Sequence, residues 1–226
     1  MSMQAASPGS IAAPQAGACA PEQMLLVAAL LCMSAGFLDA VTWLSLGRVF
    51  ASSQTGNVVF CGMYAMSGQW RQAAHHLVPL AGFLLGAAVA VRIRAPLFCL
   101  VGEIVCLTVM MLLIHRIPDA VAILGISFGI ALRSASFRQV EHKAYLSVAV
   151  TGNMLRGIDQ LLAMGDVEAL RGAGAMLAIC LSFLLGAAIG GCLTMWLGAF
   201  SLAFPIASSA CVLLLCLRHR RRSHRG

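Results

Sequence analysis

The sequence predicts an all-α fold: a polytopic transmembrane bundle of about six spans plus two half-inserted or broken helices, built from two inverted repeats. Of its 226 residues 60% are hydrophobic and 10% charged, whereas soluble domains carry about 25% charged residues. Residues 172–217 contain no Lys, Arg, Asp or Glu, although about 20 apolar residues already span a bilayer. Two motifs also occur twice, in the same order.

Apolar runs bounded by charges, proline and glycine predict the individual spans. Residues 92–96 and 115–119 each combine charged side chains with a helix-stopping proline, so they separate neighbouring spans. Two less apolar segments, about 52–67 and about 145–164, are predicted to be half-inserted or broken helices. The six predicted spans are 24–46, 77–91, 97–113, 120–132 extending to about 137, 172–196 and 199–217.

The chain is predicted to form one transmembrane domain over residues 24–217, with tails on either side. Residues 1–23 are rich in Ala, Pro, Ser and Gly and lack the basic residues of a secretory signal, which predicts a disordered tail. Residues 218–226 hold five arginines directly after a span. This tail accounts for much of the formal charge of +7 and predicts a cytoplasmic anchor, not a nucleic-acid site.

An internal duplication follows from two motifs that recur in order. The hexamer Phe-Leu-Leu-Gly-Ala-Ala stands at 83–88 and again at 183–188, and Thr-Gly-Asn stands at 55–57 and again at 151–153. Each copy has an apolar span, then Thr-Gly-Asn, then the hexamer within a span, then a last span. This order predicts a repeat over about 24–115 and another over about 119–217.

The distribution of basic residues predicts the orientation. If the Thr-Gly-Asn segments do not cross, only Arg48, Arg71 and Arg116 of the 15 Lys and Arg residues lie outside. If both segments cross, four more basic residues move outward, which the positive-inside rule disfavours. Six crossings, three in each repeat, are therefore preferred, and an odd number per repeat inserts the second copy upside down.

Several motifs resemble the YoaK-like family of bacterial inner-membrane proteins, a family of unknown function. They are Gly36-Phe37-Leu38-Asp39-Ala40, Gly47-Arg48-Val49-Phe50, Thr55-Gly56-Asn57, and Val150-Thr151-Gly152 with Arg156. The similarity covers about residues 25–217. It implies a polytopic helical membrane protein and supplies no substrate. Where the family often has Gln-Asn-Ala, this chain has Arg133-Ser134-Ala135, so no site role is carried over to that position.

Asp39 is the leading candidate for chemistry, because it interrupts an uncharged run and an acid at the bilayer centre costs roughly 2.5–3.5 kcal/mol. It either bonds helices together or forms a proton or cation site. Glu103 has the same two interpretations. Asp39 and Ser134 occupy matching places in the two repeats, so Arg133 is the expected counter-charge of Asp39.

Both Thr-Gly-Asn motifs combine a hydroxyl, a permissive glycine and an amide, which suits a helix start that exposes N–H groups. They are either polar caps at helix crossings or two halves of one mid-membrane site. The expected substrate-binding residues are therefore Asp39, Thr55, Gly56, Asn57, Arg133, Thr151, Gly152 and Asn153.

The predicted function is transport of a small molecule or ion by a multi-pass protein of the bacterial inner membrane, with the lipid bilayer as its partner. The rivals are a structural or complex-forming membrane protein and a membrane enzyme of unrecognised type. No HExxH, GxxxxGK[ST] or GxSxG motif occurs, so we expect neither catalytic residues nor a cofactor. The nine cysteines form no CxxC, and His75-His76 is better explained as interfacial than as metal-binding, so no metal is expected.

Overall fold

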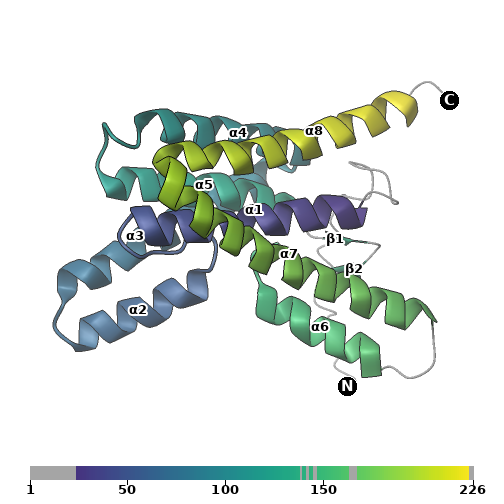
Figure 1. Cartoon of the computed structure of the whole chain (residues 1–226), viewed down its shortest axis with the longest axis horizontal. Helices are drawn as coiled ribbons and strands as arrows, with labels where there is room; N and C mark the ends of the chain where they lie inside the picture. The colour runs from purple at the N-terminus through teal and green to yellow at the C-terminus, as the bar shows by residue number, and fades with distance from the viewer. Residues whose placement is uncertain (1–23, 138, 141–142, 145–146, 163–166, 224–226) are drawn as a thin grey trace, which may run out of the picture.

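A computed structural model describes residues 24–137, 139–140, 143–144, 147–162 and 167–223 (Figure 1). The predicted N-terminal tail lies outside these residues. The regular secondary structure of the described chain is helical apart from one antiparallel pair of two-residue strands, β1 (Gln139–Val140) and β2 (Lys143–Ala144). The helices are α1 (Met24–Ser45), α2 (Gln54–Met66), α3 (Trp70–Ile93), α4 (Pro96–Leu113), α5 (Asp119–Ser136), α6 (Val150–Leu162), α7 (Val167–Leu197), the 3-10 helix η2 (Gly198–Leu202) and α8 (Ala203–Ser223).

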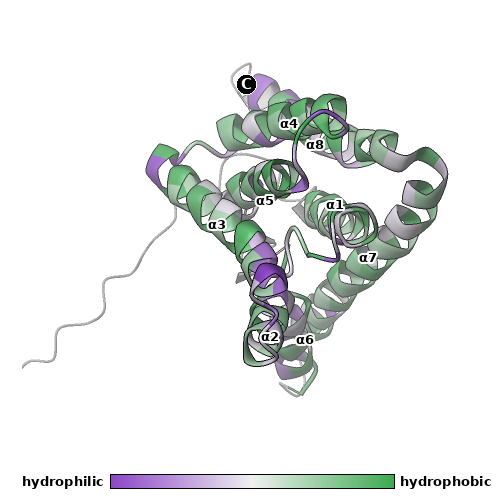
Figure 2. Cartoon of the chain, turned by 90° about the vertical axis from the view of Figure 1, so that its left-hand side faces the viewer, coloured by the Kyte–Doolittle hydropathy of each residue, from purple (hydrophilic) through white to green (hydrophobic). Residues whose placement is uncertain are grey.

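Two helices, α1 and α5, form the centre of the bundle. Figure 2 shows both of them surrounded by α3, α4, α7 and α8. Within their most apolar windows 67% of the residues of α1 and 61% of those of α5 are buried, against 28% or less in the other candidate spans. Because α1 and α5 are apolar all round, they suit an interior position, whereas the outer helices expose leucine and valine as lipid-facing helices do.

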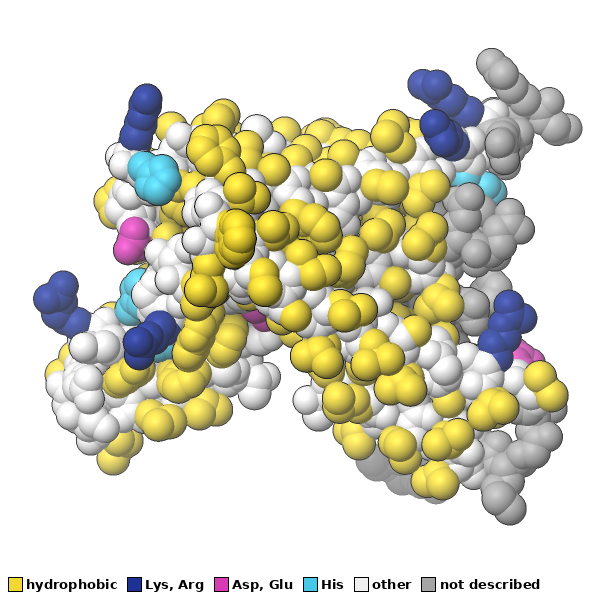
Figure 3. All heavy atoms as spheres, viewed as in Figure 1, with side chains coloured by type: hydrophobic (Ala, Val, Ile, Leu, Met, Phe, Trp, Pro, Cys, Tyr) yellow, Lys and Arg dark blue, Asp and Glu magenta, His cyan; other side chains and the backbone are white. Residues whose placement is uncertain are grey.

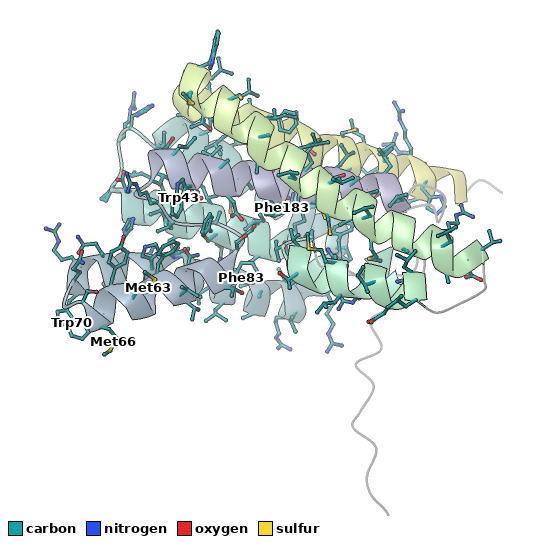
Figure 4. All side chains as sticks on the ribbon, turned by 60° about the horizontal axis from the view of Figure 1, so that its bottom comes forward. Trp43, Met63, Met66, Trp70, Phe83 and Phe183 are labelled. Carbon is teal, nitrogen blue, oxygen red and sulfur yellow. The ribbon has the colours of Figure 1, made fainter. Side chains whose placement is uncertain are left out.

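The central helices pack across the two halves of the chain. The most extensive contacts join α1 to α7 and α3 to α5. Both pairs approach through glycine: an added Cβ at Gly186 would collide with the carbonyl of Met33, and one at Gly86 would collide with the carbonyl of Phe128. Small residues thus allow close backbone contact between helices. The repeated hexamers lie at these contacts, and Figure 4 shows Phe83 and Phe183 in the middle of the molecule.

Five stretches of helix are long and apolar enough to cross a membrane. The last of them, Val167–Arg221, contains α7, η2 and most of α8. Gly198, with a φ of 53°, begins η2 in the left-handed region, and Figure 1 shows the chain turning back there. This count differs from the six predicted spans because the predicted spans 172–196 and 199–217 fall within one stretch. Helix α8 runs on to Ser223, so the predicted basic tail is partly helical.

Helices α2 and α6 correspond to the two segments predicted to be half-inserted or broken. Each has 13 residues, a length of about 20 Å, which is less than the roughly 30 Å of a hydrocarbon core. Figures 1 and 2 show the two helices on the same side of the bundle, and in Figure 1 they diverge from neighbouring N-terminal ends like the arms of an inverted V.

The surface follows the pattern of a membrane protein. Figure 3 shows hydrophobic side chains over the middle of the molecule and Lys and Arg at the two ends of its long axis. At one end the α2–α3 hairpin carries Met66 and Trp70, which are 90% and 70% exposed and point away from the body (Figure 4). Tryptophan is typical of the membrane–water interface, so this hairpin tip suits that depth.

Candidate functional site

The loop from α1 to α2 is held by the carboxylate of Asp39, which is 4% exposed. The backbone N–H of Ser52 donates to Oδ1 at 2.6 Å, the Ser52 hydroxyl donates to Oδ2 at 2.9 Å, and the Ser53 hydroxyl donates to the same Oδ2. The Asp39 side chain thus lies inside the bundle and not on its surface. Because its partners all belong to one loop, the carboxylate fixes the residues that lead into α2.

Asn57 fixes the same loop from the other side. Its Oδ1 accepts the backbone N–H of Phe50 at 3.0 Å, and its Nδ2 donates to the Phe50 carbonyl at 2.7 Å. The amide thus pairs with a peptide group as a neighbouring strand would. Thr42 adds a third attachment, since its hydroxyl oxygen accepts the N–H of Ala51 at 3.2 Å. We call Asp39, Thr42 and Asn57 the loop clamp.

The second half has a corresponding but simpler attachment. Ser134 of α5, which matches Asp39 in the duplication, accepts a hydrogen bond of 3.2 Å from the hydroxyl of Ser147, just before α6. The Cys180 thiol of α7 donates to the Val150 carbonyl at the start of α6, with an S···O distance of 3.7 Å. The second loop is therefore also tied to the bundle, but through neutral groups.

Arg133 pairs with Glu103 and not with Asp39, so the predicted Asp39–Arg133 pair is wrong. Arg133 NH1 lies 3.2 Å from Glu103 Oε1, and both side chains are fully buried. The hydroxyl of Ser209 in α8 donates to the other oxygen, Oε2, at 3.0 Å. The physical reason is that Asp39 is already satisfied by the adjacent loop, which leaves α4 to supply the counter-charge. The contact of NH1 with Glu103 is an ion pair without hydrogen-bond geometry, and among the described residues Nε, NH1 and NH2 of Arg133 make no hydrogen bond.

The two Thr-Gly-Asn motifs occupy the same place in their helices, because Thr55 and Thr151 are the second residues of α2 and α6. Both threonines are exposed, whereas both asparagines are buried. Asn153 accepts a hydrogen bond of 3.3 Å from Arg156 NH1. The motifs therefore present threonine at the neighbouring ends of the two helices and turn asparagine inward.

The motif glycines differ in their surroundings. A Cβ at Gly56 would come within 2.8 Å of the Phe50 ring, so this glycine allows the loop to pass close to α2. A Cβ at Gly152 would meet only ordinary contacts, the nearest with Arg156 at 3.6 Å. A requirement for glycine is thus explained at the first position only.

Two pockets lie beside the two short helices. One, of about 600 Å³, is a groove between α6 and α7 with mainly apolar walls, including Met154, Ile158 and Leu177, and with Asn153 at its edge. The other, of about 530 Å³, lies where the α1–α2 loop meets α2 and α3 and is lined by Arg48, Arg71, His75 and His76 with Gly47, Tyr64 and Gln72. Neither contains both Thr-Gly-Asn motifs, so the shared site stays a prediction.

Sequence reasoning did not identify the serines that complete these attachments. Ser52, Ser53, Ser147 and Ser209 bind the groups at Asp39, Ser134 and Glu103. Serine is common in loops and in apolar helices, so only its distance from a buried acid in three dimensions distinguishes these four. The pocket lined by Arg48, Arg71, His75 and His76 has a sequence signal, because Arg71 and His75-His76 lie one helical turn apart.

Comparison with known proteins agrees with this architecture. The model of a family described as a protein of unknown function, DUF1275, matches residues 27–215. A UPF0700 transmembrane protein, YoaK of Bacillus subtilis (strain 168), is 38% identical over 61 residues, and that alignment covers 27% of each chain. No solved structure matches. The predicted resemblance is thus confirmed, as is a multi-pass membrane protein.

Proposed function

Because the chain belongs to the DUF1275 family, whose function is unknown, we propose from its own geometry that it is a permease for a small solute. The proposed site lies at mid-membrane, between the N-terminal ends of α2 and α6. It combines the exposed Thr55 and Thr151 with the motif glycines and with the buried Asn57 and Asn153. Asp39 and Arg133 are buried in the bundle and contribute indirectly. Asp39 holds the loop that leads into α2, and Arg133 supplies a buried positive charge.

The observation that carries this proposal is the neighbouring position of the N-terminal ends of the two short helices (Figures 1 and 2). A helix N-terminus has unpaired N–H groups and a partial positive charge. Two such ends directed at one space favour a solute with an anionic or hydrogen-bond-accepting group. Neither α2 nor α6 has an acidic residue in its first turn to neutralise this field.

The buried guanidinium of Arg133 also favours a solute that carries a hydrogen-bond acceptor. A buried guanidinium with unmade hydrogen bonds is unfavourable by about 1–3 kcal/mol for each lost bond. Ser134, its neighbour, is bonded to the loop that enters α6, so Arg133 lies on the part of α5 that supports this helix start. A polar solute near this point would relieve part of the cost.

The proposal includes six crossings and an inverted repeat, with α7 and α8 crossing separately. The reciprocal packing of α1 on α7 and of α3 on α5, each through an equivalent glycine, supports it. We place both termini in the cytoplasm of a bacterial cell and the chain in the inner membrane, because Arg48, Arg71 and Arg116 are the only Lys or Arg residues at the opposite end within the described part of the chain. No chemical reaction is proposed.

Cysteine accessibility tests the proposed path without a known solute. Thr55→Cys and Thr151→Cys are made in a variant whose native cysteines are replaced, and a membrane-impermeant maleimide is applied to intact cells and to inverted vesicles. We expect both variants to be labelled, and from the same side of the membrane in any one state of the protein, since water reaches one space shared by the two helix ends. Leu84→Cys, which is 67% exposed on α3, is the lipid-facing control and stays unlabelled. If all three are equally unreactive, there is no aqueous path and the permease proposal fails.

A metabolite comparison then identifies the solute. Cells lacking the gene and cells overproducing the protein are compared for accumulated metabolites, and the protein is supplied as wild type, Thr55→Val or Thr151→Val. Valine keeps the shape of threonine and removes its hydroxyl. We expect one solute to change in opposite directions on deletion and overproduction, and both variants to weaken the effect at an unchanged amount of folded protein.

A complex-forming role is the second candidate, and the apolar groove between α6 and α7 favours it. Gly157 and Gly174 line this groove, and a Cβ added at Gly174 would meet nothing within 4 Å. Such a groove suits a helix of another membrane protein. This role predicts no labelling at Thr55→Cys or Thr151→Cys, together with co-purification of a partner that Gly174→Leu releases.

A further inference from the structure

The pocket of about 530 Å³ at the α2–α3 end of the bundle has the side chains of an anion site. Arg48 comes from the α1–α2 loop, and Arg71 from the first turn of α3. His75 and His76 follow on the next turn of α3, and Tyr64 faces them from α2. Figure 3 shows histidine and basic side chains together at this end of the molecule. We call this the basic pocket.

Within the described part of the chain, no acidic side chain lines the basic pocket. The one ion pair among the described residues joins Arg133 to Glu103 elsewhere. Asp39 is occupied by Ser52 and Ser53. Two permanently charged guanidinium groups therefore share one cavity without a counter-ion, an arrangement that favours a bound oxyanion.

The backbone adds to this field. Helix α3 begins at Trp70, and its N-cap residue Gln69 makes no side-chain cap hydrogen bond. The positive end of the helix thus faces the region of Arg71 and Gln72. Gly47 and Arg48 both have positive φ, 77° and 62°, and left-handed arginine is uncommon. This turn brings Arg48 to the pocket, and the Leu46 carbonyl, 3.1 Å from His75 Nε2, holds it.

His76 gives the pocket a hydrogen-bond acceptor. Its ring is 3% exposed and stacks on Phe60 and Tyr64, with centroid distances of 5.3 and 5.5 Å. Its Nδ1 lies 3.4 Å from Asn57 Oδ1. Because Asn57 pairs with the Phe50 peptide through both amide atoms, Oδ1 is the atom that faces His76. The imidazole therefore donates from Nδ1, which leaves Nε2 of the neutral ring as an acceptor.

We propose that the basic pocket binds a phosphate group that retains one proton, as inorganic phosphate does at neutral pH and as a phosphate monoester does below about pH 6. The arginines pair with the charged oxygens, and His76 Nε2 accepts the remaining O–H. Sulfate has the same charge and shape without the proton, so it is the matched competitor. The ligand is either a soluble phosphate or the monoester headgroup of phosphatidic acid. Binding here does not require transport, so the proposed permease function can fail independently.

The test measures thermal unfolding of the full chain in phosphatidylcholine nanodiscs at about pH 8, where inorganic phosphate is mainly HPO₄²⁻. Phosphate and sulfate are compared at equal ionic strength. We expect phosphate to raise the midpoint by mass action and sulfate to raise it less. Arg71→Gln weakens the apparent phosphate affinity about tenfold, as loss of a charged hydrogen-bonding partner does. Arg48→Asn should weaken the apparent phosphate affinity to a similar extent, and asparagine tolerates the left-handed φ of this position. Arg116→Gln, at an exposed position, is the control.

Nanodiscs that contain phosphatidic acid, compared with phosphatidylcholine nanodiscs at about pH 6, where a monoester headgroup retains a proton, distinguish the two sources. If this lipid raises the midpoint of the wild type and not of Arg71→Gln, and added phosphate then has no further effect, the headgroup is the ligand. If phosphate acts equally in both bilayers, the ligand is soluble. Equal effects of phosphate and sulfate, equal responses of Arg71→Gln and Arg116→Gln, or no response in either bilayer would overturn the proposal.

Discussion

The two short helices occupy equivalent places in the duplicated chain but are fixed by different chemistry. The loop into α2 is held by a buried carboxylate, a threonine and an asparagine that pairs with a peptide group. Among the described residues, the loop into α6 is attached through a bond between two serine hydroxyls and a thiol bond. The long helices of the two halves therefore pack alike, through Gly86 and Gly186, whereas the short helices are attached differently. We infer that α2 is the more rigid of the two.

The largest expected effect tests the packing that both halves share. Gly186→Leu and Gly86→Leu each force a side chain against a backbone carbonyl, of Met33 and Phe128 respectively. Backbone cannot move aside as a side chain can, so both variants should lose most folded protein, as measured by monodisperse yield after membrane extraction. Gly191→Leu, on the same helix with nothing within 4 Å of its added Cβ, is the control. A normal yield of Gly86→Leu alone would show that the halves differ in packing too.

Replacement of Asp39 comes next and tests the charged part of the loop clamp. Asp39→Leu leaves buried donors of Ser52 and Ser53 without an acceptor, which should lower the free energy of unfolding by about 3 kcal/mol. Asp39→Asn keeps one acceptor oxygen and the size of the side chain, so about 1 kcal/mol is expected. Thermal midpoints in detergent measure both changes. Similar midpoints for the two variants would mean that the carboxylate does not hold the loop.

Asn57→Ala should have an intermediate effect. It removes both hydrogen bonds to the Phe50 peptide and the contact with His76, at a cost of about 2 kcal/mol. The lost orientation of His76 should also weaken phosphate binding. The midpoint with and without phosphate reports both consequences. Unchanged stability would assign Asn57 to the solute path instead of to the clamp.

Ser134→Ala should have the smallest effect, although Ser134 matches Asp39 in the duplication. Only one neutral hydrogen bond, to Ser147, is lost, which corresponds to about 1 kcal/mol. A midpoint as low as that of Asp39→Leu would contradict the proposed difference between the two attachments. Ser182→Ala, whose hydroxyl bonds only to the Ala178 carbonyl of its own helix, serves as the control.

The sequence predicted the long apolar helices because hydropathy and charge report directly on the bilayer. It missed the start of α3 by seven residues, since Arg71, Gln72 and His75 lower the hydropathy of a helix that begins at Trp70. Burial of Asp39 was predictable from the cost of an exposed charge. Its partners were not, because Ser52 and Ser53 lie in a loop and no periodicity links them to α1.

The Arg133–Glu103 pair shows a second limit of the sequence. Both residues stood out as charges within apolar runs, but hydropathy does not specify which face of a helix meets which neighbour. Symmetry of the repeats suggested Asp39 as the partner of Arg133. The contact of α4 with α5 decided otherwise, and it places Glu103 opposite Arg133.

The crossed packing of α1 on α7 and of α3 on α5 has a consequence for biogenesis. The ribosome releases α1 long before α7, so the first helix enters the bilayer without the surface it will finally contact. Neither half can complete its structure alone, and the chain behaves as two interlocked fragments. Residues 24–115 and 119–217 produced as separate polypeptides should therefore be degraded individually and accumulate together, and the loop between α4 and α5 is the natural point at which to divide the gene.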